Sequence, residues 1–299
     1  MKEKIYLAAE VFGMCGGVHA ALKTLEELIS SAGQGVYVFR ELVHNTAVTA
    51  GFEAQGVTFT ENIADIPAGS PLVIGAHGVA PEVENVLRSR AGICRDATCP
   101  LVKKLHSVAA SLSPDDELVI YGKKSHPEVQ GVAGHSGTPH IFIISSPAEA
   151  AGVPELSRPV FISQTTVDHS EVEAALEILK KRFPEIRICS GICDASKKRQ
   201  EAVIKLASQV DAVLVLGSGH SSNARRLREI AERAGVKAFL LDSAAGLTDE
   251  MLQFPRLGVT SGASTPQYLF DGLLAALEEK GFIDGLRQKQ AEKYKKQKY

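Results

Sequence analysis

The sequence predicts an α/β fold with mainly parallel sheets, divided into three similar βα modules. Short apolar strands alternate with amphipathic helices, the order expected of parallel sheets that are covered by helices. The 299 residues, 44% of them hydrophobic, are enough for two or three modules that each bury a core. Three cysteines, Cys15, Cys99 and Cys193, recur in comparable turns between a strand and a helix.

The first part of the chain contains three predicted strands, and each ends at a polar or glycine-rich turn. Strands are predicted over 4–9, 36–43 and 71–76, and a helix with apolar residues at helical spacing over 18–30. The first strand leads to the glycines around Cys15, and the other two lead to His44 and His77. Each strand therefore ends beside a side chain that is able to meet a ligand.

The same order returns in the middle of the chain. A turn over 96–99 precedes a helix that begins at Pro100, because proline suits the first turn of a helix. Strands are predicted over 117–121, 141–144 and 160–163, and a closing helix over 168–183. His126 and Glu128 follow the first of these strands, and Thr165 follows the third.

The last part of the chain continues the alternation. Strands are predicted over 186–189, 212–216, 237–241 and 256–260, and helices after Cys193, over 224–234 and over 265–280. The stretch 217–222 resembles a dinucleotide-binding motif, but Ser222 stands where the third glycine would be. The Walker lysine is also missing, which excludes nucleotide hydrolysis by a P-loop.

Three of the five cysteines are candidates for one metal centre. Cys15, Cys99 and Cys193 each lie about one βα module from the next, although no pair forms the compact Cys-x-x-Cys of most zinc sites. An iron–sulfur cluster normally takes four thiolates, so three would leave one iron open to a substrate. Cys94 and Cys189 instead lie in apolar, strand-like stretches, where cysteine usually acts as a small buried hydrophobe.

Histidines and hydroxyl groups favour a compact anionic ligand. His44, His77 and His126 follow strands in matching positions, and imidazoles near neutrality donate to phosphate oxygens. Further donors lie near helix N-termini, where anions are favoured: Ser221, Ser222, Asn223 and Ser264. The collection fits a phosphate or diphosphate.

Glu128 is the best candidate for a general acid. A glutamate in the first turn of a helix is usually solvated and stabilised by the helix dipole. In a dry pocket beside a cluster it would hold a proton and deliver it to a leaving group. Thr165 and Thr166 would ordinarily cap a helix, and in such a pocket one hydroxyl would relay or orient that proton.

Charge and hydropathy exclude several classes of protein. The net charge of −2 gives no broad electrostatic reason for nucleic-acid binding. The longest apolar runs, such as 212–216, are too short to cross a bilayer, and the N-terminus lacks a signal-peptide pattern. We therefore expect a cytoplasmic protein without nucleic-acid or membrane partners, with a solvated basic tail at its C-terminus.

The ordered motifs resemble the 4-hydroxy-3-methylbut-2-enyl diphosphate reductase family, which performs the terminal step of the non-mevalonate isoprenoid pathway. The matching stretches run from the first strand to nearly the last helix. They are Cys15-Gly16-Gly17-Val18, Val43-His44-Asn45, Ala76-His77-Gly78-Val79, Asp96-Ala97-Thr98-Cys99-Pro100-Leu101-Val102, His126-Pro127-Glu128-Val129, Gln164-Thr165-Thr166, Ile192-Cys193, Ser221-Ser222-Asn223 and Gly262-Ala263-Ser264.

The resemblance implies an architecture and a cofactor. The three modules would form a pseudo-threefold trefoil around a central [4Fe–4S] cluster held by Cys15, Cys99 and Cys193. The implied modules are 16–98, 99–189, and 1–15 with 190–282, followed by a basic tail over 283–299.

The resemblance also implies an activity. The enzyme would reductively remove the allylic hydroxyl of 4-hydroxy-3-methylbut-2-enyl diphosphate to give isopentenyl and dimethylallyl diphosphates. Glu128, Thr165 and His126 would be catalytic. The implied substrate-binding residues are His44, His77, His126, Thr165, Ser221, Ser222, Asn223 and Ser264. A ferredoxin or flavodoxin would donate electrons to a monomer or weak homodimer.

Other interpretations stay open at this point. The sequence around Met14 and over 196–198 departs from the usual family pattern, which suits a diverged paralogue that reduces another substrate. A non-catalytic iron–sulfur sensor and a structural zinc protein are also compatible with three cysteines. Metal and sulfide analysis separates these interpretations, because a zinc site contains no sulfide.

Overall fold

A computed structural model describes residues 3–33, 35–189 and 191–286. The strands are β1 (Ile5–Ala8), β2 (Tyr37–Phe39), β3 (Thr58–Thr60), β4 (Pro71–Ile74), β5 (Ile93–Asp96), β6 (Glu117–Tyr121), β7 (Ile141–Ile144), β8 (Pro159–Ser163), β9 (Arg187–Cys189), β10 (Ala212–Leu216), β11 (Lys237–Leu241), β12 (Arg256–Ser261) and β13 (Ile283–Asp284). The helices are α1 (Gly16–Ala32), α2 (Thr46–Glu53), α3 (Pro81–Arg90), α4 (Pro100–Ala110), α5 (Pro127–Gly134), α6 (Pro147–Ala151), α7 (His169–Arg182), α8 (Asp194–Ala207), α9 (Ser222–Arg233), α10 (Asp249–Leu252) and α11 (Gln267–Glu279), with 3₁₀ turns η1 (Ile63–Asp65) and η2 (Ala244–Gly246).

The chain divides into two compact units. Unit 1 comprises the residues up to 15, residues 44–47 and those from 195 onward. Unit 2 comprises residues 16–43 and 48–194. The five-stranded sheet belongs to unit 1, and both four-stranded sheets belong to unit 2.

The three sheets share one strand order. Their orders are β3-β2-β4-β5, β7-β6-β8-β9 and β11-β10-β12-β1-β13. Each begins with the second strand of its module, followed by the first, the third and the fourth, and the paired strands are parallel. In the five-stranded sheet the fourth place is taken by β1, from the start of the chain. The predicted fold of three similar modules with parallel sheets is therefore confirmed.

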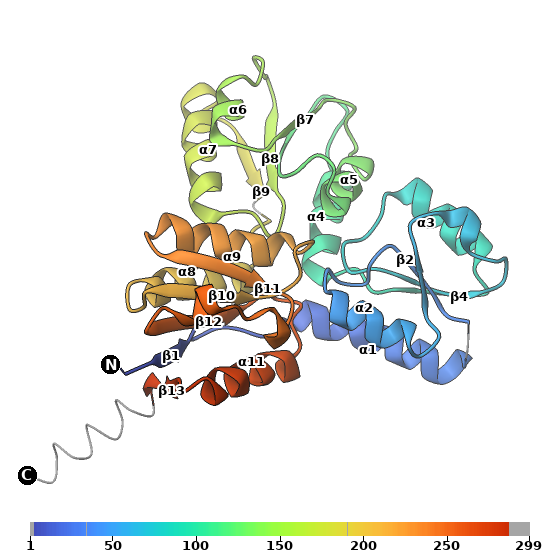
Figure 1. The fold of residues 1–299 in the computed structure, drawn as a ribbon. Helices are drawn as coiled ribbons and strands as arrows, with labels where there is room; N and C mark the ends of the chain where they lie inside the picture. The colour runs from blue at the N-terminus through green and yellow to red at the C-terminus, as the bar shows by residue number, and fades with distance from the viewer. Residues whose placement is uncertain (1–2, 34, 190, 287–299) are drawn as a thin grey trace, which may run out of the picture. The chain divides into compact units, whose positions relative to one another are not determined.

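Helices cover both faces of the five-stranded sheet in unit 1. Val213 and Val215 of β10 face one layer and pack with Leu227 of α9. Leu214 faces the opposite layer and packs with Leu273 of α11. Figure 1 accordingly shows α8 and α9 on one side of this sheet and α11 on the other. The alternation of neighbouring residues between two apolar layers explains why β10 is apolar at every position.

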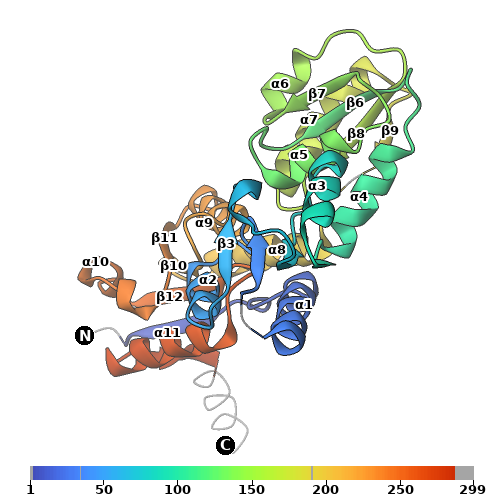
Figure 2. The same cartoon turned by 90° about the vertical axis from the view of Figure 1, so that its right-hand side faces the viewer.

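The sheet of β6 to β9 in unit 2 is covered in the same manner. Val119 and Tyr121 pack toward α7, whereas Leu118 and Ile120 pack toward α4 and α5. Helix α5 also contacts α3, which belongs to the preceding module, as Figure 2 shows. The two four-stranded modules therefore meet through α5.

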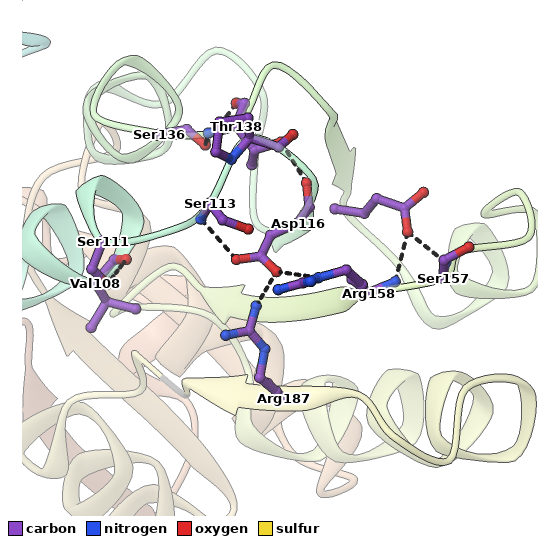
Figure 3. Close-up of polar contacts among 11 residues, drawn as sticks. Val108, Ser111, Ser113, Asp116, Ser136, Thr138, Ser157, Arg158 and Arg187 are labelled. Carbon is purple, nitrogen blue, oxygen red and sulfur yellow. Dashed lines mark hydrogen bonds and ion pairs between the residues drawn. The ribbon is translucent and has the colours of Figure 1, made fainter.

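A buried carboxylate fastens the amino ends of β6, β8 and β9. Asp116 Oδ1 lies 2.5 Å from Nη2 of Arg187 and accepts a hydrogen bond from Nε of Arg158 at 3.2 Å. Its Oδ2 accepts the backbone N–H of Ser113 at 2.9 Å. Figure 3 shows the two guanidinium groups converging on this carboxylate. The arginine next to it holds the pKa of Asp116 well below its usual range.

The structure corrects the strand expected over 36–43. Strand β2 ends at Phe39, because Arg40 adopts a φ of 64°, which is incompatible with a strand. The apolar residues beyond it, Leu42 and Val43, are buried in a loop, where the carbonyl of Leu42 accepts the N–H of Ala76 at 3.0 Å. These residues are buried although they do not belong to a strand, so the apolar run predicted a strand longer than β2.

The C-terminal end of the described chain extends a sheet. Strand β13 occupies the first two positions of the expected basic tail and pairs with β1. The remainder of that tail, 287–299, lies outside the described residues. No helix in the described part of the chain has both the length and the apolar character needed to span a bilayer.

Candidate functional site

The three candidate cysteines occupy equivalent places in the three sheets. Cys15, Cys99 and Cys193 follow β1, β5 and β9, each the fourth strand of its sheet, and each directly precedes a helix. All five cysteines are described, and none forms a disulfide.

Backbone hydrogen bonds repeat the equivalence. The N–H of Cys99 donates to the carbonyl of Ala76 at 3.0 Å, and that of Cys193 to the carbonyl of Thr165 at 3.3 Å. In unit 1 the N–H of Cys15 donates to the carbonyl of Ala263 at 3.0 Å. Every acceptor lies in the turn that follows the third strand of the same sheet. Each module therefore joins a cysteine turn to a turn that carries a predicted polar site residue.

Two buried serines in these turns are functional candidates that sequence reasoning missed. Ser261 ends β12 and accepts the N–H of Gly13 at 2.7 Å; Ser163 ends β8 and accepts the N–H of Gly191 at 3.0 Å. Both glycines lie two residues before a cysteine, and Gly13 has a φ of 76°, a conformation that favours glycine. The repeated Gly-x-Cys spacing was the available sequence signal.

A buried arginine also holds the Cys15 turn. Arg199 is 3% exposed and donates from Nη2 to the carbonyl of Gly13 at 2.7 Å. Its Nη1 donates to the carbonyl of Ala195, one turn earlier in α8, also at 2.7 Å. Both backbone groups of Gly13 are thus fixed, which defines the path of the chain into Cys15.

The other two cysteines fit the structural interpretation. Cys94 lies within β5 and packs against the core of its module, and burial raises the pKa of its thiol. Cys189 lies within β9 and packs against the core between the sheet and α4. Neither precedes a helix, so the distinction drawn from the sequence corresponds to a difference in local structure.

The donor set fits an iron–sulfur cluster. Cys15, Cys99 and Cys193 are half-buried thiols in turns whose backbones are fixed by hydrogen bonds. Thiolate sulfur is the ligand that such clusters require, and three thiolates leave one coordination position for another ligand.

In unit 1 three of the predicted anion-binding residues, Ser221, Ser222 and Asn223, lie at the start of α9. Ser221 is the N-cap of this helix, and its Oγ accepts the N–H of Ala224 at 3.3 Å. Asn223 is 6% exposed, and its Nδ2 has no hydrogen-bond partner among the described residues. A buried amide donor without a partner is costly unless a ligand accepts its hydrogen bond. This position is therefore suited to an anion.

The turn after β12 fixes another predicted residue of unit 1. The Oγ of Ser264 donates to the backbone carbonyl of His44 at 3.0 Å. Ser264 is buried, whereas Ser222 at the first position of α9 is half-buried. Unit 1 thus contains His44 and all four of the predicted serine and asparagine donors.

In unit 2 two predicted histidines are in contact. The rings of His77 and His126 meet edge to face, with centroids 5.4 Å apart and planes at 85°. His126 caps α5, and its Nδ1 accepts the N–H of Glu128 at 3.2 Å. This hydrogen bond places the proton of the neutral His126 ring on Nε2. His126 is therefore prepared to donate a hydrogen bond from Nε2.

Glu128 is a buried carboxyl group that contacts a single threonine through both oxygens. It is 1% exposed, although it lies in the first turn of α5. The N–H of Thr165 donates to Oε1 at 2.6 Å, and the hydroxyl of Thr165 donates to Oε2 at 2.8 Å. Burial raises the pKa of Glu128 to about 7, against the opposing effect of the two hydrogen bonds. Such a carboxyl group exchanges a proton near neutral pH.

The loop that carries Thr165 is itself held from both sides. Gln164 is 4% exposed; its Oε1 accepts the N–H of Lys123, and its Nε2 donates to the hydroxyl of Thr166. Thr166 therefore supports the loop, and Thr165 is the hydroxyl that meets Glu128. This settles which of the two threonines contacts the candidate acid.

Comparisons with known proteins agree with these features. The family model described as LytB protein matches residues 5–278. A relative named 4-hydroxy-3-methylbut-2-enyl diphosphate reductase, from Methylococcus capsulatus, is 40% identical over 277 residues, covering 90% of this chain and 88% of the relative. A protein of the same name from Acidothermus cellulolyticus is 40% identical over 283 residues, covering 92% of this chain and 83% of that relative.

Two solved structures are also similar to the chain. The E-1-hydroxy-2-methyl-but-2-enyl-4-diphosphate reductase from Plasmodium falciparum superposes with a TM-score of 0.89 at 28% identity, covering 94% of this chain and 91% of that chain. A structure described as (E)-4-hydroxy-3-methyl-but-2-enyl diphosphate reductase, the terminal enzyme of the non-mevalonate pathway, gives a TM-score of 0.66 at 28% identity, covering 92% of this chain and 99% of that chain.

Proposed function

The chain belongs to the LytB protein family, and we propose that it is an iron–sulfur oxidoreductase acting on 4-hydroxy-3-methylbut-2-enyl diphosphate. The reaction would consume two electrons and two protons. It would break the allylic C–O bond and release water, giving isopentenyl or dimethylallyl diphosphate. The observation that carries this proposal is the buried Glu128, whose pKa of about 7 suits a proton donor to the departing hydroxyl.

The cofactor is proposed to be a [4Fe–4S] cluster held by Cys15, Cys99 and Cys193. Their equivalent places after the fourth strands, and their equivalent backbone hydrogen bonds, support a shared role. When bound, the cluster would supply single electrons and a Lewis-acidic iron. A pseudo-threefold trefoil of the three modules around it, with the boundaries given above, is part of the same proposal.

The diphosphate would be held by the histidine, serine and asparagine side chains. In unit 1 the unpartnered Nδ2 of Asn223 and the N-terminus of α9 would donate to phosphate oxygens, together with Ser221, Ser222 and His44. Ser264 would join them by turning its hydroxyl away from the carbonyl of His44. In unit 2 His77 and His126 would donate from their rings, and for His126 the donating atom would be Nε2. These residues would orient the substrate by donating hydrogen bonds to its phosphate oxygens.

Proton delivery would pass through Thr165. When Glu128 is protonated, its Oε2–H would donate to the hydroxyl oxygen of Thr165, reversing the hydrogen bond of the ionised form. The threonine hydroxyl would then pass its own proton to the leaving oxygen. The N–H of Thr165 would stabilise the carboxylate that results. Burial of the pair excludes water and keeps the proton available near pH 7.

The electrons would come from a separate ferredoxin or flavodoxin. A cytoplasmic location and a monomeric or weakly dimeric state complete the proposal.

The deciding experiment measures cofactor and turnover on one sample. Protein is reconstituted anaerobically, analysed for iron and sulfide, and supplied with a one-electron donor and the hydroxylated allylic diphosphate. We expect roughly four irons with sulfide per chain and formation of both products. A cluster-loaded sample without turnover would contradict the proposed activity, and zinc without sulfide would favour a structural metal site. Turnover of a different allylic substrate, without turnover of this diphosphate, would identify a diverged paralogue. The sequence at Met14 and over 196–198 is the reason to consider one.

A further inference from the structure

His106 is a buried histidine of unit 2 that has no part in the proposed chemistry. It lies in α4, is 8% exposed, and stacks on the ring of His135, with centroids 3.9 Å apart and planes at 15°. Its Nε2 has no hydrogen-bond partner among the described residues. Burial, with His135 beside it, lowers the pKa of His106 to about 4, so the ring is neutral near pH 7.

Two glycines bring backbone segments directly against this ring. A Cβ at position 78 would lie 2.7 Å from Cε1 of His106, and a Cβ at position 131 would lie 2.8 Å from Nε2. Both separations are shorter than any ordinary carbon contact, so the ring fills the space that a side chain at either position would need. Gly78 also has a φ of 69°, which favours glycine. The ring therefore separates the turn at Gly78 from the middle of α5.

The two segments carry groups of the candidate site. Gly78 directly follows His77, and Gly131 lies three residues after Glu128 in α5. The edge-to-face contact between His77 and His126 joins the same two segments on the side of the site. A third contact keeps them close, because a Cβ at position 134 would lie 2.4 Å from Cβ of Ala80. Figure 2 shows α4 beside α3 and α5 in this region.

We propose that His106 is a positioning residue, whose ring sets the separation between the His77 turn and helix α5. The inference rests on the proposed function, because the segments matter through the diphosphate-binding histidines and the proton donor that they carry. Its contribution is geometric: the ring fixes His77 relative to His126 and Glu128. A displacement of about 1 Å in such groups is enough to change turnover about a hundredfold.

A cavity lies next to the ring of His106, and it determines what would fill the space if the ring were removed. The cavity has a volume of about 300 Å³ and is lined by residues that include His106, His135, Asp96 and Lys103. The last two form an ion pair at 2.6 Å, so the wall is polar. Removing the ring would join its space to this polar cavity, where water is accommodated. The His77 turn and α5 would then lose the spacer between them.

The test compares His106→Ala with His106→Gln, which restores a neutral, planar group of similar length. We expect His106→Ala to raise KM for the allylic diphosphate at least about tenfold. It should also shift the pH profile of kcat, because a displaced α5 would change the contacts that set the pKa of Glu128. His106→Gln should return both quantities toward the wild-type values. His140→Ala, an exposed histidine of the same module, is the control and should change neither.

Several outcomes would overturn the inference. A folded His106→Ala protein with unchanged KM and pH profile would do so, as would a loss of activity that only follows the folded fraction. Should that variant fail to fold, Gly131→Ala inserts a methyl group against Nε2 and is expected to raise KM in the same direction; a folded Gly131→Ala protein with unchanged KM would also overturn it. Calorimetric titration with inorganic diphosphate gives a readout that needs no turnover. Failure of the wild-type enzyme to turn over would count against the proposed function instead.

Discussion

Asp116 and Glu128 are both buried carboxyl groups of the second module, yet their pKa values shift in opposite directions. Asp116 precedes the amino end of β6, where Arg187 and Arg158 stabilise its charge. Glu128 follows the carboxyl end of the same strand, where burial dominates and Thr165 supplies two neutral donors. The module thus keeps one carboxylate ionised to fasten the sheet, and one carboxyl group able to change its protonation state.

The largest effect should come from Glu128→Gln. The amide retains the size of the side chain and its hydrogen bond from the N–H of Thr165, but it has no proton to deliver. We expect kcat to fall by about 10²–10⁴-fold with an unchanged iron and sulfide content. Glu173→Gln, which alters an exposed glutamate of the same module, is the control. Unchanged turnover in Glu128→Gln would show that another group supplies the proton.

The corresponding change at the amino end, Asp116→Asn, should affect stability rather than chemistry. It removes a charge that accepts hydrogen bonds from Arg187, Arg158 and Ser113. Both arginine side chains are more than half exposed and would be solvated after the change, so the expected loss is about 1–3 kcal/mol of unfolding free energy. Denaturant unfolding measures it, with the neighbouring exposed residue in Asp115→Asn as the control. A large drop in kcat of the folded Asp116→Asn variant would contradict the prediction that Asp116 affects stability and not catalysis.

The pH dependence of stability should also differ between the two sites. The folded-state pKa of Asp116 is depressed, so its contribution is present at neutral pH and is lost as the pH falls through the acid range. The folded-state pKa of Glu128 is raised from 4.5 to about 7, so the unfolded chain releases its proton first and stability decreases as the pH rises between these values.

Unfolding curves of Asp116→Asn and Glu128→Gln, measured at several pH values, test whether the two pKa shifts have opposite effects on stability. Relative to wild type, Asp116→Asn should be destabilised at pH 7 and nearly equal in strong acid. Glu128→Gln should be equal near pH 4 and more stable at pH 8, because the amide avoids ionisation in the buried site. Curves that run in the same direction for both variants would refute the assigned pKa shifts.

The smallest effect is expected from Arg187→Gln. The Arg187 side chain is 54% exposed, and an exposed partner contributes little net free energy because solvent screens its charge. Since Arg158 and the N–H of Ser113 continue to bind the carboxylate, the variant should lose about 0–1 kcal/mol. A loss as large as that of Asp116→Asn would mean that Arg187 alone accounts for the stability at this end of the sheet.

Local sequence was sufficient for the elements with clear periodicity. The apolar stretches at β6, β7 and β10 are predicted with the bounds that the structure gives, because apolar residues of these strands pack on both faces of their sheets. The helix at Pro100 begins where proline permits it. Short elements such as α2 and β3 were not predicted, since eight and three residues carry too little periodicity.

The candidate site was predictable where its residues follow strands. Cys99, His126 and Thr165 stand out because polar residues at the carboxyl ends of parallel strands share one edge of a sheet. Ser261 and Ser163 did not stand out, because each is the last residue of an apolar strand, and their glycine partners lie far away along the chain. His106 was equally hidden, since a histidine within a helix gives no sign of the glycines that approach it.

The sequence by itself determined the α/β class, the repeated strand-end turns and the identity of the groups available for chemistry, because these depend on periodicity and residue type. Only the tertiary structure decided which carboxyl group stays ionised beside arginines and which has the raised pKa that suits the proposed proton donor. Asp116 and Glu128 are both acidic residues next to β6, and the sequence does not show that Arg187 contacts one of them and Thr165 the other. A pKa is set by desolvation and by neighbouring charges, and both depend on contacts between residues distant in sequence.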